Sequence, residues 1–158
     1  MTRVIAIDPG YDRCGIAIVE KTNGREVLVY SECVLTSKAL PFPQRLHIIG
    51  EAVARVITEH QPKCLAMETL YFSKNTKTAI AVAEARGVIT FVAASHSLPL
   101  YEYSPGSIKV AVTGSGNADK SQVIKMVPKL ITIDPTKKML DDEYDAIAIG
   151  ITHLASKR

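Results

Sequence analysis

The 158-residue sequence predicts a single α/β domain, residues 1–158, built on a five-stranded mixed sheet with helices on both faces. Three observations lead to this fold class. The chain begins with three consecutive strand-like segments, and an Asn-Gly hairpin signal separates the second from the third. Helical and strand-like segments then alternate, as they do when crossover helices join parallel strands. Hydrophobic residues make up 47% of the chain, which is enough to bury a substantial core.

The three N-terminal strands are expected to form an antiparallel meander. Residues 3–8 are a short apolar run, rich in β-branched residues, that ends at a Pro-Gly turn signal. Asp8 would therefore lie at the carboxyl end of a buried strand. The second and third strands, residues 14–20 and 26–35, flank the Asn-Gly turn.

The middle of the chain alternates helices with strands. A helix over residues 44–60 has apolar side chains at helical spacing, and residues 64–67 then form a short apolar strand that ends at Glu68. Because this strand follows a crossover helix, it should lie parallel to the first strand. A second helix over residues 76–94 leads to a fifth strand, residues 98–103, which is expected to be parallel as well.

The last third of the sequence is helical, with loops between the helices. A short helix starts at Ser104-Pro105, because proline suits the first turn of a helix. Residues 113–117 form a glycine-containing flexible loop, and a helix begins near Asp119. Residues 131–138 are another loop, after which the final helix begins around Asp141.

Composition narrows the class of protein. The sequence shows no apolar signal region at its N-terminus and no apolar run that we judge long enough to cross a bilayer, so we expect a cytoplasmic protein with no membrane partner. Cys14, Cys33 and Cys64 are widely spaced, which fits reduced structural residues better than disulfides or a zinc site. The net charge of +3 is unremarkable, but it becomes about +7 once the four acids assigned below to a metal are set aside, and that excess suits a polyanion partner, although many basic proteins bind none.

Two acidic residues follow predicted strands. If the strands that end at Asp8 and Glu68 are adjacent and parallel, both carboxylates lie on one rim of the sheet. Two like charges in that position are unfavourable unless a divalent cation bridges them or one acid keeps its proton. Two simpler interpretations remain open: Asp8 could cap its own turn, and Glu68 could merely begin a solvated loop.

Further acids cluster at the start of the final helix. Asp142 and Asp145 are three residues apart, so they share a helix face and could present both carboxylates to one ion. Acids also favour helix N-termini, so Asp141 or Asp142 could simply be the N-cap, although capping does not explain Asp145. The pair Asp141 and Asp145 is a second possibility, and Glu143 is a further neighbour.

A set of four carboxylates without histidine or cysteine ligands suits hard cations, Mg²⁺ or Mn²⁺, better than zinc. Two such ions about 4 Å apart would activate a water molecule and stabilise the leaving oxygen during phosphodiester cleavage. The acids therefore predict a metal-dependent nuclease.

Taken together, these segments closely resemble the RuvC family of bacterial Holliday junction resolvases, within the RNase H-like and retroviral-integrase superfamily. The likeness runs over essentially the whole chain, and the order of the motifs makes it specific. The matching segments are Ile7-Asp8-Pro9-Gly10 with Gly15, residues 68–75 (Glu-Thr-Leu-Tyr-Phe-Ser-Lys-Asn), Ala85-Arg86-Gly87-Val88, residues 103–109, Asp119-Lys120-Ser121-Gln122 and residues 142–153.

The resemblance implies an RNase H-like fold and assigns the reaction centre. The family's catalytic acids, which bind the metal, match Asp8, Glu68, Asp142 and Asp145, and two Mg²⁺ ions per site are implied, with Mn²⁺ as a substitute. His153 lies about two turns beyond Asp145, so we interpret it as structural and not as a general base.

The resemblance also implies a set of DNA-binding residues. Tyr71 stands where the family has a phenylalanine that approaches the junction centre, and its ring would still stack on a base. Phe72 and Asn75 belong to the same stretch, although both aromatic residues could instead belong to the core or to a dimer contact. Lys109 and Lys120 match lysines that contact the DNA backbone or the scissile phosphate, whereas a lysine by itself is more often an ordinary surface residue.

The function implied is paired, symmetric incision of four-way DNA junctions by a homodimer in recombination and repair, leaving 5′-phosphate and 3′-hydroxyl ends. A two-fold enzyme would present two identical sites to a pseudo-two-fold substrate. Cooperation with a branch-migration motor is implied as well. One alternative is an RNase H-superfamily nuclease acting on RNA–DNA hybrids or structured RNA. Another is an actin-like or sugar-kinase-like phosphate-binding module, although that fold usually needs two such domains.

Overall fold

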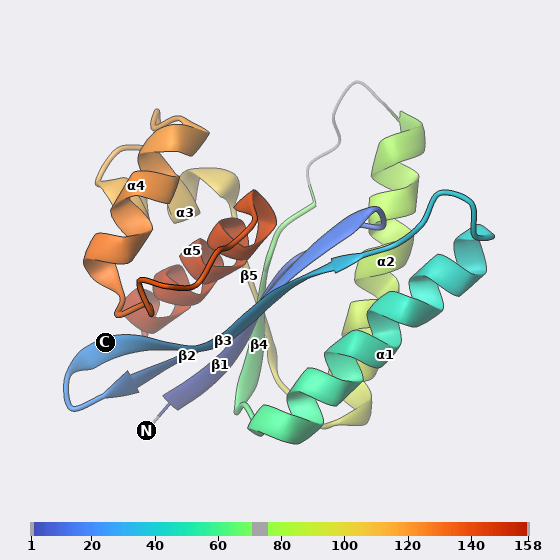
Figure 1. The fold of residues 1–158 in the computed structure, drawn as a ribbon, viewed down its shortest axis with the longest axis horizontal. Helices are drawn as coiled ribbons and strands as arrows, with labels where there is room; N and C mark the ends of the chain where they lie inside the picture. Colours follow the sequence, from blue (N-terminus) through green and yellow to red (C-terminus); the bar gives the residue numbers. More distant parts are fainter. Residues whose placement is uncertain (1, 71–75, 158) are drawn as a thin grey trace.

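A five-stranded sheet in the order β3-β2-β1-β4-β5 forms the centre of the protein (Figure 1). The structure is a computed structural model, and it describes residues 2–70 and 76–157. Strands β1 and β2 pair antiparallel, as do β2 and β3, while β4 pairs parallel with β1 and β5 parallel with β4. The predicted mixed sheet is therefore confirmed. The strands are β1 (Thr2–Asp8), β2 (Arg13–Thr22), β3 (Arg25–Leu35), β4 (Cys64–Glu68) and β5 (Leu100–Tyr103).

Five helices in the described part of the chain cover both faces of the sheet. Figure 1 shows α1 and α2 on one side of the strands, with α3, α4 and α5 on the other. Each face has its own buried apolar cluster, as expected when alternate strand residues point to opposite sides. The helices are α1 (Phe42–His60), α2 (Thr76–Ser95), α3 (Pro105–Thr113), α4 (Lys120–Leu130) and α5 (Asp141–Ser156).

The face beneath α5 is lined by small residues. Ala6, Ala17 and Ala66 are fully buried there, whereas the opposite face carries larger side chains such as Ile5 and Ile7. Glycines let α5 come closer still. A Cβ on Gly150 would lie 2.6 Å from a Val19 methyl group, and a Cβ on Gly15 would lie 2.0 Å from the Asp142 carbonyl oxygen. The first turn of α5 therefore rests against the start of β2.

Several element boundaries differ from those predicted. Helix α1 begins at Phe42 and not at residue 44, because Pro43 fits within the first turn. Strand β5 begins at Leu100 and not at residue 98, because Ser97, with φ of 55°, still belongs to the turn after α2. Within the predicted loop over residues 131–138, Thr132 forms an isolated β-bridge with Val27.

The outer surface of α2 corrects one expectation from the sequence. By length and composition α2 could cross a membrane, so the expectation that no apolar run is long enough was wrong. Such a test is also met by helices that cover a sheet, and Ala85 and Ile89 are indeed buried in the core. Only 22% of the apolar window is buried, however, and Ile80 and Phe91 are 55% and 73% exposed. The outer face of α2 is therefore an uncovered apolar surface.

Candidate active site

Asp8 and Glu68 lie side by side at the carboxyl ends of two adjacent parallel strands. Ile7 of β1 pairs with Met67 of β4, and each acid is the next residue of its strand. By strand alternation both acids point to the same side as Ala6 and Ala66, which is the side covered by α5. The sheet thus brings together two residues that are sixty positions apart, as expected if the first and fourth strands are adjacent and parallel.

Helix α5 adds Asp142 and Asp145 to this pair. Burial is the main cause that raises the pKa of Asp8 to about 8, and the negative charges of Asp145, Glu68 and Asp142 raise it further. Burial, followed by the charge of Asp145, raises the pKa of Glu68 as well. The four predicted acids therefore repel one another at the rim of the sheet, and in the absence of a bound cation Asp8 retains its proton at neutral pH.

Two predicted lysines lie within the same region. Lys120 places its Nζ 2.8 Å from Asp145 Oδ2, and this hydrogen bond raises the pKa of Lys120. Lys109 and Lys120 line a pocket of about 240 Å³ together with Glu68 and Asp145. The charge of Lys109 opposes the rise in the pKa of Glu68, so it acts on the acidic group from a short distance.

A second pocket, of about 220 Å³, opens on the other side of Glu68, toward α2. Asp8, Glu68 and Arg86 line it together with residues of α2. Arg86 is mostly buried and donates to the backbone carbonyl oxygen of Glu68 and to the Glu102 carboxylate. It therefore fixes the end of β4. Its place within the Ala-Arg-Gly-Val motif was the only sign of this role in the sequence.

Arg13 is another residue that the sequence did not single out. Its guanidinium lies 2.6 Å from Asp142 Oδ2, and the contact joins the first residue of β2 to the first turn of α5. The Cys33 side chain and the negative charge of Asp142 stabilise the charged form and raise the pKa of Arg13. Neither partner is near Arg13 in the chain, so no local pattern could have revealed the pairing.

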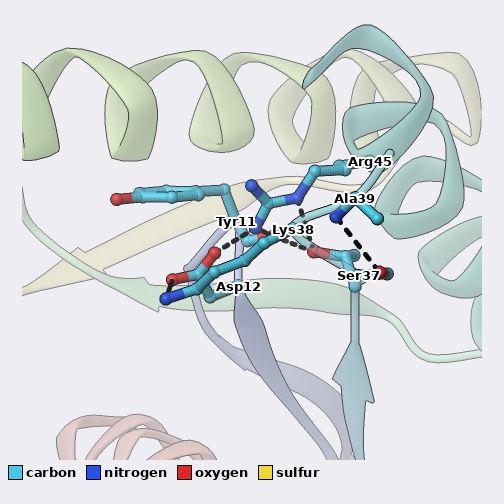
Figure 2. Close-up of polar contacts among 7 residues, drawn as sticks. Tyr11, Asp12, Ser37, Lys38, Ala39 and Arg45 are labelled. Atoms are coloured by element: carbon cyan, nitrogen blue, oxygen red, sulfur yellow. Dashed lines mark hydrogen bonds and ion pairs between the residues drawn. The ribbon is translucent and has the colours of Figure 1, made fainter. Parts of the chain in front are cut away.

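The loop between Asp8 and Arg13 is held by a buried arginine of α1. Figure 2 shows Arg45 reaching from α1 to Tyr11 and Asp12. Arg45 donates to the Tyr11 carbonyl oxygen at 3.1 Å, to Thr36 Oγ1 at 3.0 Å and to the Asp12 carboxylate, and only 7% of Arg45 is exposed. Lys38 approaches the same carboxylate at 3.7 Å. These contacts fix the backbone that follows Asp8.

Glu143 resolves the capping alternative for α5. Leu140 occupies the N-cap position, and its N–H donates to Glu143 Oε2 at 2.9 Å, while Glu143 Oε1 accepts from Ser31 Oγ at 2.8 Å. Glu143 is thus buried against β3 as part of the cap. Neither Asp141 nor Asp142 is the N-cap, and Asp141 is exposed on the first turn.

His153 has a structural environment. It is 1% exposed, its Nε2 lies 3.3 Å from Cys64 Sγ, and its Nδ1 lies 2.9 Å from the Tyr103 hydroxyl. These contacts join α5 to β4 and β5. Tyr71, Phe72 and Asn75, which were predicted to bind DNA, lie outside the described residues.

The acids fit a hard cation by chemistry, but they are not arranged around one. Within residues 2–70 and 76–157, no group of three or more potential ligand side chains is positioned to hold a metal ion as it stands. Two of the four carboxylates are instead engaged by cations of the chain, Asp142 by Arg13 and Asp145 by Lys120. All four donors are oxygens that repel one another at a partly buried rim, which is the setting that a divalent ion relieves.

Comparison with known proteins identifies the family. The family model described as crossover junction endodeoxyribonuclease RuvC matches residues 4–153. The chain is 41% identical to a protein of that name from Thermosipho melanesiensis over 94% of either chain. It is also 41% identical to one from Caldicellulosiruptor saccharolyticus over 98% of this chain and 93% of the relative.

A solved structure gives the same answer for the fold. T. thermophilus RuvC in complex with a Holliday junction substrate superposes with a TM-score of 0.91 at 30% identity, over 100% of this chain and 96% of that one. The five-stranded sheet with helices on both faces is therefore the RNase H-like fold of that enzyme. These matches show that the chain belongs to the RuvC family of crossover junction endodeoxyribonucleases.

Proposed function

We propose that this protein is a metal-dependent endodeoxyribonuclease that resolves four-way (Holliday) DNA junctions in recombination and repair. The observation that carries the proposal is the group of four acids at the rim of the sheet: Asp8 is buried there beside Asp145, Glu68 and Asp142, and burial together with their charges raises its pKa to about 8. Such a concentration of carboxylates at a sheet rim has no evident structural purpose. Family membership supports a junction as substrate, since T. thermophilus RuvC is described in complex with one.

We assign Asp8, Glu68, Asp142 and Asp145 as the metal ligands, with two Mg²⁺ ions per site and Mn²⁺ as a substitute. Bound Mg²⁺ would supply an activated water molecule and positive charge at the leaving oxygen. The chain's own residues have separate tasks. Asp8 must give up its proton before it can bind a cation, because its pKa lies near 8 in the metal-free protein. Lys109 and Lys120 line the pocket beside Glu68 and would balance the growing charge of the scissile phosphate.

We further propose that residues 1–158 act as one nuclease domain that pairs into a homodimer in the cytoplasm. The uncovered apolar face of α2, with Ile80 and Phe91, supports this, since an exposed apolar patch commonly marks a protein contact. Two subunits would incise a junction at symmetric positions. Tyr71, Phe72 and Asn75 are proposed to contact the junction centre, and a branch-migration motor is a proposed partner.

Substrate choice tests the proposal. The purified protein is incubated with a synthetic four-way junction, a duplex of matched sequence and an RNA–DNA hybrid while Mg²⁺ or Mn²⁺ is titrated. We expect metal-dependent cleavage of the junction, with paired nicks at symmetric positions and little cleavage of the other two. Equal cleavage of all three substrates, or cleavage of the hybrid alone, would support the alternative of an RNase H-type nuclease. Thermal stabilisation by ATP would instead support the phosphate-binding module.

A further inference from the structure

The two α5 acids assigned as metal ligands, Asp142 and Asp145, are neutralised by basic side chains of the protein itself. Arg13 lies 2.6 Å from Asp142, and Lys120 lies 2.8 Å from Asp145. Lys120 matches a lysine that the family resemblance already places at the DNA. Arg13 comes from a different element, the start of β2, and nothing in the proposed mechanism yet uses it. Each of these two carboxylates is therefore paired with a basic side chain where a metal ion would have to bind.

The backbone around Arg13 directs its side chain to this place. A Cβ on Gly10 would lie 2.1 Å from the Arg13 carbonyl oxygen, so only glycine allows the tight turn that precedes β2. Gly15, two residues after Arg13, lets the first turn of α5 approach. The neighbouring acid Asp12 cannot compete for Arg13, because Arg45 and Lys38 already bind it (Figure 2).

The ion pair is also able to open. The Arg13 side chain is 47% exposed and that of Asp142 is 19% exposed. An ion pair this open to water is weak, and a divalent cation attracts a carboxylate more strongly than a guanidinium does. A displaced guanidinium remains charged at every relevant pH, and its planar set of donors matches a phosphate group.

We propose that Arg13 is an exchangeable counter-ion of the active site. It neutralises Asp142 while no metal is bound, is displaced when a divalent cation binds that carboxylate, and then contacts a phosphate of the DNA strand. This inference rests on the proposed function, since it needs Asp142 to be a metal ligand. The proposal implies an order of binding. The metal ion binds Asp142 first, and the Arg13 guanidinium that it displaces then strengthens the binding of DNA.

Two measurements on Arg13→Gln test the exchange. In the first, Mn²⁺ is titrated calorimetrically into the protein without DNA. Removing the competing guanidinium should tighten Mn²⁺ binding by about two- to five-fold, the factor expected when a weak ion pair no longer competes. Arg13→Lys, which keeps the charge, should stay close to the wild type. If Arg13→Gln does not fold, Arg13→Met, which retains part of the apolar stem, replaces it.

The second measurement is the salt dependence of junction binding, with and without Ca²⁺, using DNA that is verified to be intact afterwards. With Ca²⁺ the slope of log K against log salt should be about one smaller in magnitude for Arg13→Gln than for the wild type, the loss of one phosphate contact. Without metal the two slopes should agree, because Arg13 is then engaged with Asp142.

Arg55→Gln is the matched control. Arg55 is 42% exposed and forms ion pairs with Glu32 and Glu59, away from the acidic group, so its loss should change neither measurement. Unchanged Mn²⁺ affinity in Arg13→Gln would overturn the proposal, and so would a slope difference that is the same with and without metal. If the proposed function itself fails, the wild type will not cleave junctions in Mg²⁺, a result that the Mn²⁺ titration does not depend on.

Discussion

At the scale of single residues, burial and charge set Asp8 apart from an ordinary aspartate. Its pKa of about 8 exceeds the usual 3.8 because the carboxyl group is buried and because three other acids surround it. Between these two values the folded, metal-free protein holds a proton on Asp8 that the unfolded chain does not. The stability that Asp8 contributes is therefore complete below about pH 4 and is lost as the pH rises through about 8.

This linkage predicts opposite pH trends for folding and for metal binding. The free energy of unfolding of the metal-free protein should fall as the pH rises from about 4 to about 8, and Asp8→Asn should remove most of that fall. Mg²⁺ affinity should rise over the same range, because binding displaces the proton. Denaturant unfolding and calorimetric titration at a series of pH values measure the two trends. Identical unfolding profiles for wild type and Asp8→Asn would contradict the assignment.

The sequence could predict Asp8 and Glu68 because a strand end is a local feature that the pattern of apolar residues reveals. It could not choose between Asp141 and Asp142, because the choice depends on which residue caps α5. That cap is made by Glu143 and stabilised by Ser31 of β3, a contact that no spacing rule contains. The role of Arg13 was not predicted for the same reason, since its partner Asp142 lies on a helix that is distant in the sequence.

At the scale of elements, the site depends on how closely α5 approaches the sheet. Gly15 and Gly150 remove the side chains that would otherwise separate α5 from β2. Gly150 allows the middle of α5 to approach the sheet, and Gly15 allows the first turn of α5, with its acids, to approach the start of β2. The helix and strand periodicities predicted most elements well, but boundaries set by turns, such as the starts of α1 and β5, were displaced by two residues.

Gly15→Ala should therefore disturb both stability and activity. The added methyl group would lie 2.0 Å from the Asp142 carbonyl oxygen, so backbone must move. We expect a loss of about 1 to 3 kcal/mol in the free energy of unfolding, typical of overpacking, and slower junction cleavage because Asp142 shifts. Gly106→Ala is the control: its nearest contact is 3.9 Å away, and stability should change by less than about 0.5 kcal/mol. Thermal or denaturant unfolding measures the loss of stability in both variants. An equal loss in Gly15→Ala and Gly106→Ala would contradict close packing at Gly15.

At the scale of the whole molecule, the acidic rim and the apolar face of α2 lie on different elements, and we assign catalysis to the first and subunit association to the second. The sheet and α5 carry the four acids of the proposed reaction centre, while the exposed apolar face of α2 is the proposed contact with a second copy. Sequence analysis predicted the sheet order's essential feature, two parallel strands ending side by side, because crossover connections constrain topology. It missed the apolar length of α2, because the charged residues Lys77, Glu84 and Arg86 interrupt the apolar pattern of that segment.

The association state tests the role proposed for α2. Replacing both Ile80 and Phe91 with glutamate should convert the proposed dimer to a monomer, because the charges could not be buried in an apolar contact. Sedimentation equilibrium measures this directly, and paired incision should give way to single nicks. Val110→Glu, a change at an exposed apolar residue of α3, should leave the mass unchanged. A double variant with the wild-type mass would exclude α2 from the interface.

The most direct test of the reaction centre is single-turnover cleavage of a synthetic four-way junction by variants that remove one acid each, with junction binding measured in parallel. Asp8→Asn, Glu68→Gln, Asp142→Asn and Asp145→Asn should each slow cleavage by about 1,000-fold or more, since several kcal/mol of charge stabilisation is lost with the metal. All four should still bind the junction, because removing a negative charge does not weaken binding to a polyanion. Asp141→Asn should cleave at nearly the wild-type rate. Wild-type cleavage by any of the four, or an Asp141→Asn variant as inactive as Asp142→Asn, would contradict the assignment of the metal-binding acids.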